Sequence, residues 1–138
     1  MKKVNLMLLA FLLMAFQCDE DADFIEDPLF ESGLMGRWEL ADETINGISD
    51  LLPKCCRFFE FSPDGNPEDL EGLVSYTDET GVFEGVFTLD PENQTIALRR
   101  ENRTPVTYSY SLSSAGDYLE FSFSEGDAEF LQGWQRTE

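Results

Sequence analysis

Hydrophobic and polar residues alternate with a period of two over most of the chain from Gly36 onwards. Such alternation is typical of β-strands that bury one face. We expect about eight short strands, separated by turn residues. Their predicted ranges are Gly36–Leu40, Cys56–Phe61, Leu73–Tyr76, Val82–Leu89, Thr95–Arg99, Val106–Leu112, Tyr118–Ser124 and Glu129–Arg136.

The predicted strands are joined by short polar segments that favour turns. Segments 62–65 and 90–93 carry the Pro, Asp, Gly and Asn residues of tight turns. This order indicates an all-β fold, an antiparallel up-and-down meander, and eight strands suffice to close a small β-barrel. Only residues 42–52 could hold a short helix, around Ile48, Leu51 and Leu52, and they could equally form a loop.

The N-terminal residues have the pattern of a removable signal peptide. Two lysines precede Val4–Phe16, which is apolar except for Asn5. A helix of this length rises about 20 Å at 1.5 Å per residue, which is shorter than the roughly 30 Å hydrocarbon core of a bilayer. We therefore expect residues 1–17 to be a signal peptide rather than a permanent membrane anchor.

Segment 15–18 resembles a lipobox, in which the cysteine is acylated and becomes the mature N-terminus. Cys18 would carry the lipid, although Gln17 stands where Gly, Ala or Ser is usual, and cleavage that leaves a thiol is the alternative. Segment 19–23 resembles the acidic export tag of surface lipoproteins of the Bacteroidetes type, and would also suit a solvated tether. We expect residues 18–33 to form a lipidated tether in the cell envelope, with the outer membrane and surface exposure favoured.

The charge of the chain narrows its possible partners and chemistry. The formal net charge is −19 at pH 7, which disfavours nucleic acid, and there is no histidine. The commonest general base and a frequent metal ligand are therefore missing. We expect no enzyme, no cofactor and no metal site, because carboxylates such as Glu60, Glu84 and Glu120 alternate outwards and should face water.

Two further groups of side chains have a chemical and a structural interpretation. Cys55 and Cys56 could form a vicinal disulfide, pair with another molecule, or stay reduced, and we favour two buried thiols that act as small apolar residues. The basic cluster Arg99, Arg100 and Arg103 could receive an anion, but a solvated hairpin with surface salt bridges is favoured. Segment 64–69 offers oxygen ligands for Ca²⁺, yet its spacing favours a turn.

Three motifs give the chain a family resemblance. Gly36-Arg37-Trp38 opens the first strand, segment 59–65 reads Phe-Glu-Phe-Ser-Pro-Asp-Gly, and Trp134-Gln135-Arg136 lies near the end. Together with the strand count, these residues resemble the lipocalin-like domains of small bacterial lipoproteins, over roughly residues 34–138. The Thr-Asp-Tyr motif of more typical lipocalins has no counterpart here. The resemblance implies that Arg136 packs across the Trp38 indole at the closed end of a barrel.

The resemblance also implies a function. A lipid-anchored module of this kind would bind a small apolar or amphipathic ligand in the barrel mouth, and the alternative is an envelope interaction or scaffold protein whose barrel is filled. With twelve Phe, four Tyr and two Trp in the chain, we expect a mostly filled interior. The candidate ligand-facing residues are Phe83, Phe87, Tyr108, Tyr110, Phe121 and Phe123.

Overall fold

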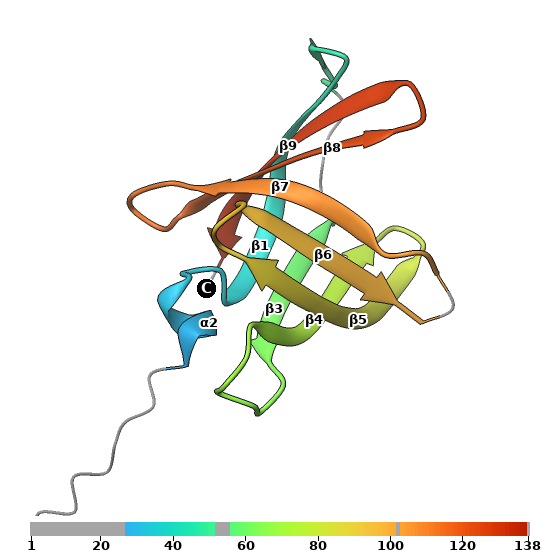
Figure 1. Cartoon of the computed structure of the whole chain (residues 1–138). Coiled ribbons are helices and arrows are strands. Elements are labelled where there is room, and N and C mark those ends of the chain that lie inside the picture. Colours follow the sequence, from blue (N-terminus) through green and yellow to red (C-terminus); the bar gives the residue numbers. More distant parts are fainter. Residues whose placement is uncertain (1–26, 52–55, 102, 138) are drawn as a thin grey trace, which may run out of the picture.

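The computed structural model describes residues 27–51, 56–101 and 103–137, which form one antiparallel sheet that closes on itself (Figure 1). A short helix, α2, spans Pro28–Glu31 and precedes the sheet. The strands are β1 Gly36–Ile45, β2 Ile48–Ser49, β3 Phe58–Pro63, β4 Glu71–Asp78, β5 Gly81–Asp90, β6 Thr95–Arg100, β7 Val106–Leu112, β8 Tyr118–Glu125 and β9 Ala128–Thr137.

The sheet is an up-and-down meander that closes into a barrel. Each strand from β3 to β9 pairs with the next one along the chain, and β1 pairs with both β3 and β9. The two-residue β2 is added to the edge of β1. The barrel therefore has eight strands, β1 and β3 to β9, which confirms the fold class expected from the alternation of apolar and polar residues.

Each predicted strand overlaps an observed one, although several boundaries differ. The weak pattern at Leu73–Tyr76 lies within the longer β4, because pairing with β3 and β5 holds residues that have little strand propensity of their own. The strand predicted from Cys56 starts at Phe58 instead. Cys56 has φ of +77°, a left-handed conformation that cannot continue a strand.

The helix considered for residues 42–52 is wrong for its described part, 42–51. Strand β1 continues to Ile45, and the chain then turns back into β2 at Ile48. Asn46 and Gly47 have φ of +52° and +75°, as the two central residues of a type I′ hairpin turn require. The Asn-Gly pair was a sequence signal for this hairpin.

The core lies inside the barrel and is rich in aromatic side chains. The ring centroids of Phe61 and Phe87 are 5.3 Å apart, and those of Phe59 and Trp134 are 4.6 Å apart. These contacts fill the core of the barrel. The buried apolar residues are Leu29, Leu34, Trp38, Leu40, Phe59, Phe61, Val74, Phe87, Leu89, Ile96, Leu98, Leu119, Phe121 and Trp134.

Helix α2 covers the barrel end where β1 begins (Figure 1). Asp27 caps the helix, since its carboxylate accepts a hydrogen bond from the Leu29 amide at 2.9 Å. The Leu29 side chain is fully buried and belongs to the core. The packed structure therefore includes residues 27–33, which sequence analysis had assigned to the tether.

Candidate ligand-binding site

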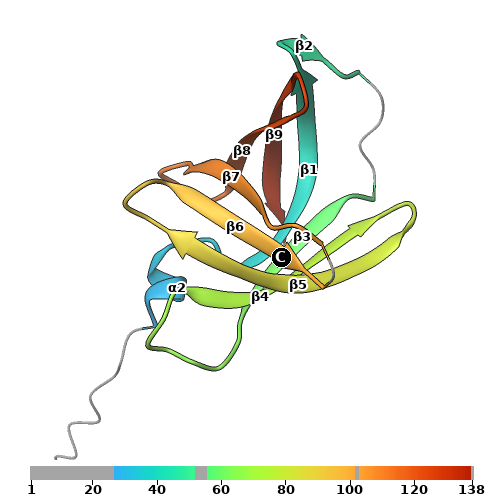
Figure 2. The ribbon, with the colours of Figure 1, turned by 45° about the vertical axis from the view of Figure 1, so that its right-hand side comes forward.

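The strands separate at the barrel end opposite α2. Among the described residues, β7 and β8 pair only over 109–112 and 119–122, and β1 and β3 only over 36–39 and 58–61. The remaining parts of β1, β8 and β9 continue with β2 as an arm that leaves the sheet of β3 to β7 (Figure 2). This divergence opens the barrel interior at that end.

A cavity of about 210 Å³ lies inside the open end. Every strand from β3 to β9 contributes to its walls, because alternate residues of each strand point inwards. Five of the lining side chains are aromatic, and three are charged or amide groups. The lining residues are Phe59, Val74, Tyr76, Phe83, Gly85, Leu98, Arg100, Val106, Tyr108, Phe123, Glu125 and Gln132.

The six candidate ligand-facing residues occupy three different environments. Phe83, Tyr108 and Phe123 line the cavity. Phe87 and Phe121 also point inwards, but both are fully buried in the core and do not line it. Tyr110 packs against the core outside the cavity lining. The interior is thus filled near α2 and hollow at the other end. The expectation of a mostly filled barrel therefore holds only for the end near α2.

Gly85 shapes one wall of the cavity. It pairs with Val74 on one side and with Arg100 on the other. A Cβ atom at this position would lie 2.5 Å from the Arg99 carbonyl oxygen, which is closer than atoms can approach. The missing side chain lets β5 and β6 come together here and leaves room on the inner face.

Arg100 is the lining residue that sequence analysis assigned to the wrong environment. The basic cluster was expected on a solvated hairpin, but only Arg99 and Arg103 are exposed. Arg100 follows the buried residues Ile96 and Leu98 on the inner face of β6, and its guanidinium carbon lies 5.8 Å from the centroid of the Phe83 ring. The period-two pattern of β6 was the signal for this placement.

A buried carboxylate that the sequence analysis missed lies beside the cavity. Glu43 is only 6% exposed, because the register shift between Leu40 and Asp42 turns residue 43 to the inside. It accepts a hydrogen bond from the side-chain amide of the lining residue Gln132 at 2.5 Å, and its carboxylate is 3.4 Å from the Arg57 guanidinium. The bulge that creates this site had no clear sequence signal.

Burial changes the titration of the two tyrosines in the cavity wall. Desolvation raises the pKa of Tyr76 above its usual value, and the nearby Arg57 opposes the shift. Desolvation likewise raises the pKa of Tyr108, and Arg100 opposes it. Both phenols are therefore neutral at pH 7, and each can donate or accept a hydrogen bond in the cavity.

At the closed end, the structure brings Trp38 and Arg136 together. The guanidinium carbon lies 4.2 Å from the centroid of the Trp38 ring, and the two residues are register partners in β1 and β9. The guanidinium donates to the carbonyl oxygens of Met35 at 2.6 Å, Gly116 at 2.7 Å, and Gly33. The pair therefore lies at the opposite end of the barrel from the cavity.

The remaining candidate groups do not add to the cavity. Cys18, Cys55 and the leader lie outside the described residues, and Cys56 is exposed, so the buried-thiol interpretation is wrong for it. No helix in the described part of the chain is long and apolar enough to cross a bilayer. Glu60 and Glu84 are exposed on the outer face. Glu120 is half-buried and does not line the cavity.

Segment 64–69 is held by hydrogen bonds of its own. The Asp64 carboxylate accepts from the Asn66 amide at 2.8 Å, and the Asp69 carboxylate accepts from the Asn66 side chain at 2.5 Å. These contacts describe a turn. Across residues 27–51, 56–101 and 103–137, no three His, Cys, Asp or Glu side chains form a group suited to a metal ion.

Comparison with known proteins places the chain by its fold. No protein-family model and no curated protein sequence matches it. A de novo designed fluorescence-activating β-barrel is similar in structure, with a TM-score of 0.51 and 15% sequence identity over 77% of this chain and 95% of the designed one. A mutant of the fluorescent protein UnaG matches with a TM-score of 0.48 and 12% identity, over 78% of this chain and 99% of that one. The shared architecture is that of a closed antiparallel β-barrel.

Proposed function

We propose that this protein is a binding module that holds a small apolar or amphipathic molecule in the cavity at the open end of the barrel. The observation that carries this proposal is the cavity itself, walled by five aromatic side chains and few polar ones. Ligand sites are usually concave and mostly apolar, with a few polar groups that fix orientation. The alternative, a scaffold protein, was expected with a filled barrel and no small-molecule ligand, and the cavity favours the binding module.

The size of the cavity limits the ligand. Sites for drug-sized molecules usually measure about 300–1,000 Å³. The cavity of about 210 Å³ is smaller. The ligand is therefore a small molecule, or only one end of a longer molecule enters.

A cavity-filling substitution tests this proposal. Val106→Phe adds a ring to a side chain that lines the cavity, whereas Val82→Phe adds the same ring to an outward side chain that is 62% exposed. A panel of short fatty acids, alcohols and small aromatic compounds is screened by melting temperature. A ligand at 100 times its Kd stabilises the native state by about 2.7 kcal/mol, which raises the melting temperature measurably.

The expected result is that at least one compound stabilises the unsubstituted protein and V82F, but not V106F. The proposal is wrong if no compound in the panel shifts the melting temperature. It is also wrong if V106F responds as strongly as V82F, because the ligand would then bind elsewhere.

We also propose that the protein is anchored to the cell envelope through a lipid on Cys18. Support comes from the apolar leader that ends at this cysteine and from the acidic segment after it. Metabolic labelling with an alkyne-tagged fatty acid should mark the protein, and Cys18→Ser should abolish the label while Cys56→Ser keeps it. Labelling that persists in C18S would contradict the proposal.

A further inference from the structure

Arg100 is held in the cavity wall by the strand to which it belongs. Ile96 and Leu98, the preceding inward residues of β6, are both buried in the core. Arg100 continues this row and is half-buried at the cavity, beside Phe83. Its neighbour Arg99 points outwards and is exposed. The position of the charge is therefore set by the period of the strand.

The Arg100 guanidinium has no carboxylate partner in the described part of the chain. Other arginines of that part also lack an ion pair, but they are exposed or, in the case of Arg136, hydrogen-bonded to backbone carbonyls. Arg57, the other basic side chain near the cavity, is ion-paired with Glu43. The guanidinium carbon of Arg100 lies over the Phe83 ring, 5.8 Å from the ring centroid. A half-buried guanidinium thus faces the cavity with its hydrogen-bond donors available.

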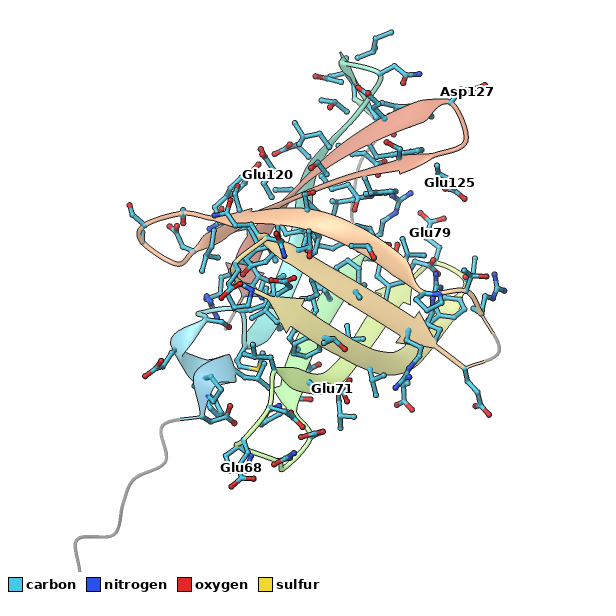
Figure 3. All side chains as sticks on the ribbon, in the orientation of Figure 1. Glu68, Glu71, Glu79, Glu120, Glu125 and Asp127 are labelled. Atoms are coloured by element: carbon cyan, nitrogen blue, oxygen red, sulfur yellow. The ribbon has the colours of Figure 1, made fainter. Side chains whose placement is uncertain are left out.

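Exposed acidic side chains lie around the entrance, and the buried Glu43 beside the cavity is ion-paired with Arg57. Figure 3 shows Glu79, Glu125 and Asp127 at the open end of the barrel, and all three are exposed. Glu125 also lines the cavity, yet it forms no ion pair with Arg100. Among the lining residues, Arg100 therefore carries the positive charge and Glu125 the negative one, and both stay available to a ligand.

We propose that the cavity binds an anionic amphiphile, whose carboxylate pairs with the Arg100 guanidinium while its apolar body lies against Phe83, Tyr108 and Phe123. This inference rests on the proposed function and deepens it by naming the class of ligand. A planar guanidinium matches a carboxylate with two parallel hydrogen bonds, and such charge-assisted bonds are stronger than neutral ones. Half-burial reduces competition from water.

The size of the cavity selects a short apolar body. Each lining aromatic ring offers a face or an edge to a hydrocarbon chain, and no lining residue other than Arg100 is basic. Octanoate therefore serves as the probe. Octanamide has the same length without the charge, and octylammonium carries the opposite charge.

The test compares these three probes by isothermal titration calorimetry. We expect octanoate to bind the protein about ten-fold or more tightly than octanamide, because a charge-assisted hydrogen bond is worth more than a neutral one. Arg100→Gln should reduce octanoate affinity to the level of octanamide and leave octanamide unchanged. Arg99→Gln, the same change on the outer face of the same strand, should leave both affinities unchanged. Melting temperatures confirm that both variants are folded.

The outcomes separate this inference from the proposed function. If octanamide binds as tightly as octanoate, or if R100Q keeps the preference for octanoate, the anionic class is wrong although the cavity still binds ligands. Tighter binding of octylammonium would assign the selectivity to Glu125 and also overturn the inference. If none of the probes binds and no compound in the wider panel shifts the melting temperature, both proposals are wrong.

Discussion

Arg136 links three separate segments at the closed end of the barrel. Its guanidinium donates to the carbonyls of Gly33 and Met35 in the N-terminal segment and of Gly116 in the turn between β7 and β8. It also stacks on the Trp38 ring. The Trp38 indole in turn donates to the Leu34 carbonyl at 2.9 Å. The turn and the N-terminal segment are thus tied to the last strand by one side chain, which uses the fixed fork of the guanidinium.

We predict that Arg136→Lys destabilises the protein even though it keeps the charge. A lysine ammonium cannot serve three carbonyls in the arrangement that the guanidinium reaches, so partly buried acceptors lose their donors at a cost of about 1–3 kcal/mol. The measurement is urea unfolding. The matched control is Arg37→Lys, because Arg37 stacks on Phe58 at the same 4.2 Å but on the outer face, where the contact contributes about 0.5–1 kcal/mol. Equal effects of the two substitutions would contradict this account.

At the scale of elements, sequence alternation predicts strands well, because a period of two is set by the strand itself. It found all eight strands of the barrel and placed Phe83, Tyr108 and Phe123 on inner faces. It did not find the burial of Glu43, since a bulge inserts one residue and reverses the faces that follow.

The same alternation could not show that the strands part at one end. Parting depends on the pairing between strands that are distant in sequence, such as β1 with β3. The cavity depends on that divergence, so its place was not predictable from the pattern. Helix α2 was missed for another reason: its four residues are too few for a helical period.

Helix α2 should contribute to stability through a single side chain. Leu29 is fully buried, whereas its neighbour Phe30 is 60% exposed. We predict that Leu29→Ala lowers the free energy of unfolding by about 2–5 kcal/mol, the usual range for a buried leucine, and that Phe30→Ala has a much smaller effect. Urea unfolding of both variants provides the test. If the two losses are similar, the helix does not pack as described.

At the scale of the whole molecule, most acidic side chains in the described part of the chain are exposed, whereas the tyrosines are partly buried in the barrel. Figure 3 shows some of these acidic side chains at both ends of the barrel. The four tyrosines lie in three of the barrel strands, β4, β7 and β8, and all have a raised pKa, with burial as the largest cause. The tyrosine phenols are therefore neutral at pH 7, and they lie beneath a surface that is rich in carboxylates.

Tyr118 shows the strongest effect of this arrangement. Its hydroxyl donates to the Asp42 carboxylate at 2.9 Å and joins β8 to β1 across β9. Gly133 lies between them, and a Cβ atom there would fall 1.8 Å from the Tyr118 hydroxyl oxygen. Desolvation, reinforced by the hydrogen bond and the charge of Asp42, raises the pKa of Tyr118 to about 12.

This titration predicts a loss of stability at alkaline pH. An unfolded tyrosine ionises near its usual pKa of about 10, whereas the folded Tyr118 does so at about 12. The stabilising contribution is complete below pH 10 and is lost as the pH rises towards 12, since the unfolded state releases its proton first.

We predict that the melting temperature falls between pH 10 and pH 12, and falls less steeply in Tyr118→Phe. Below pH 9, the melting temperatures of the two proteins should depend on pH in the same way. A variant that loses stability between pH 10 and 12 as steeply as the unsubstituted protein would show that Tyr118 does not carry this dependence.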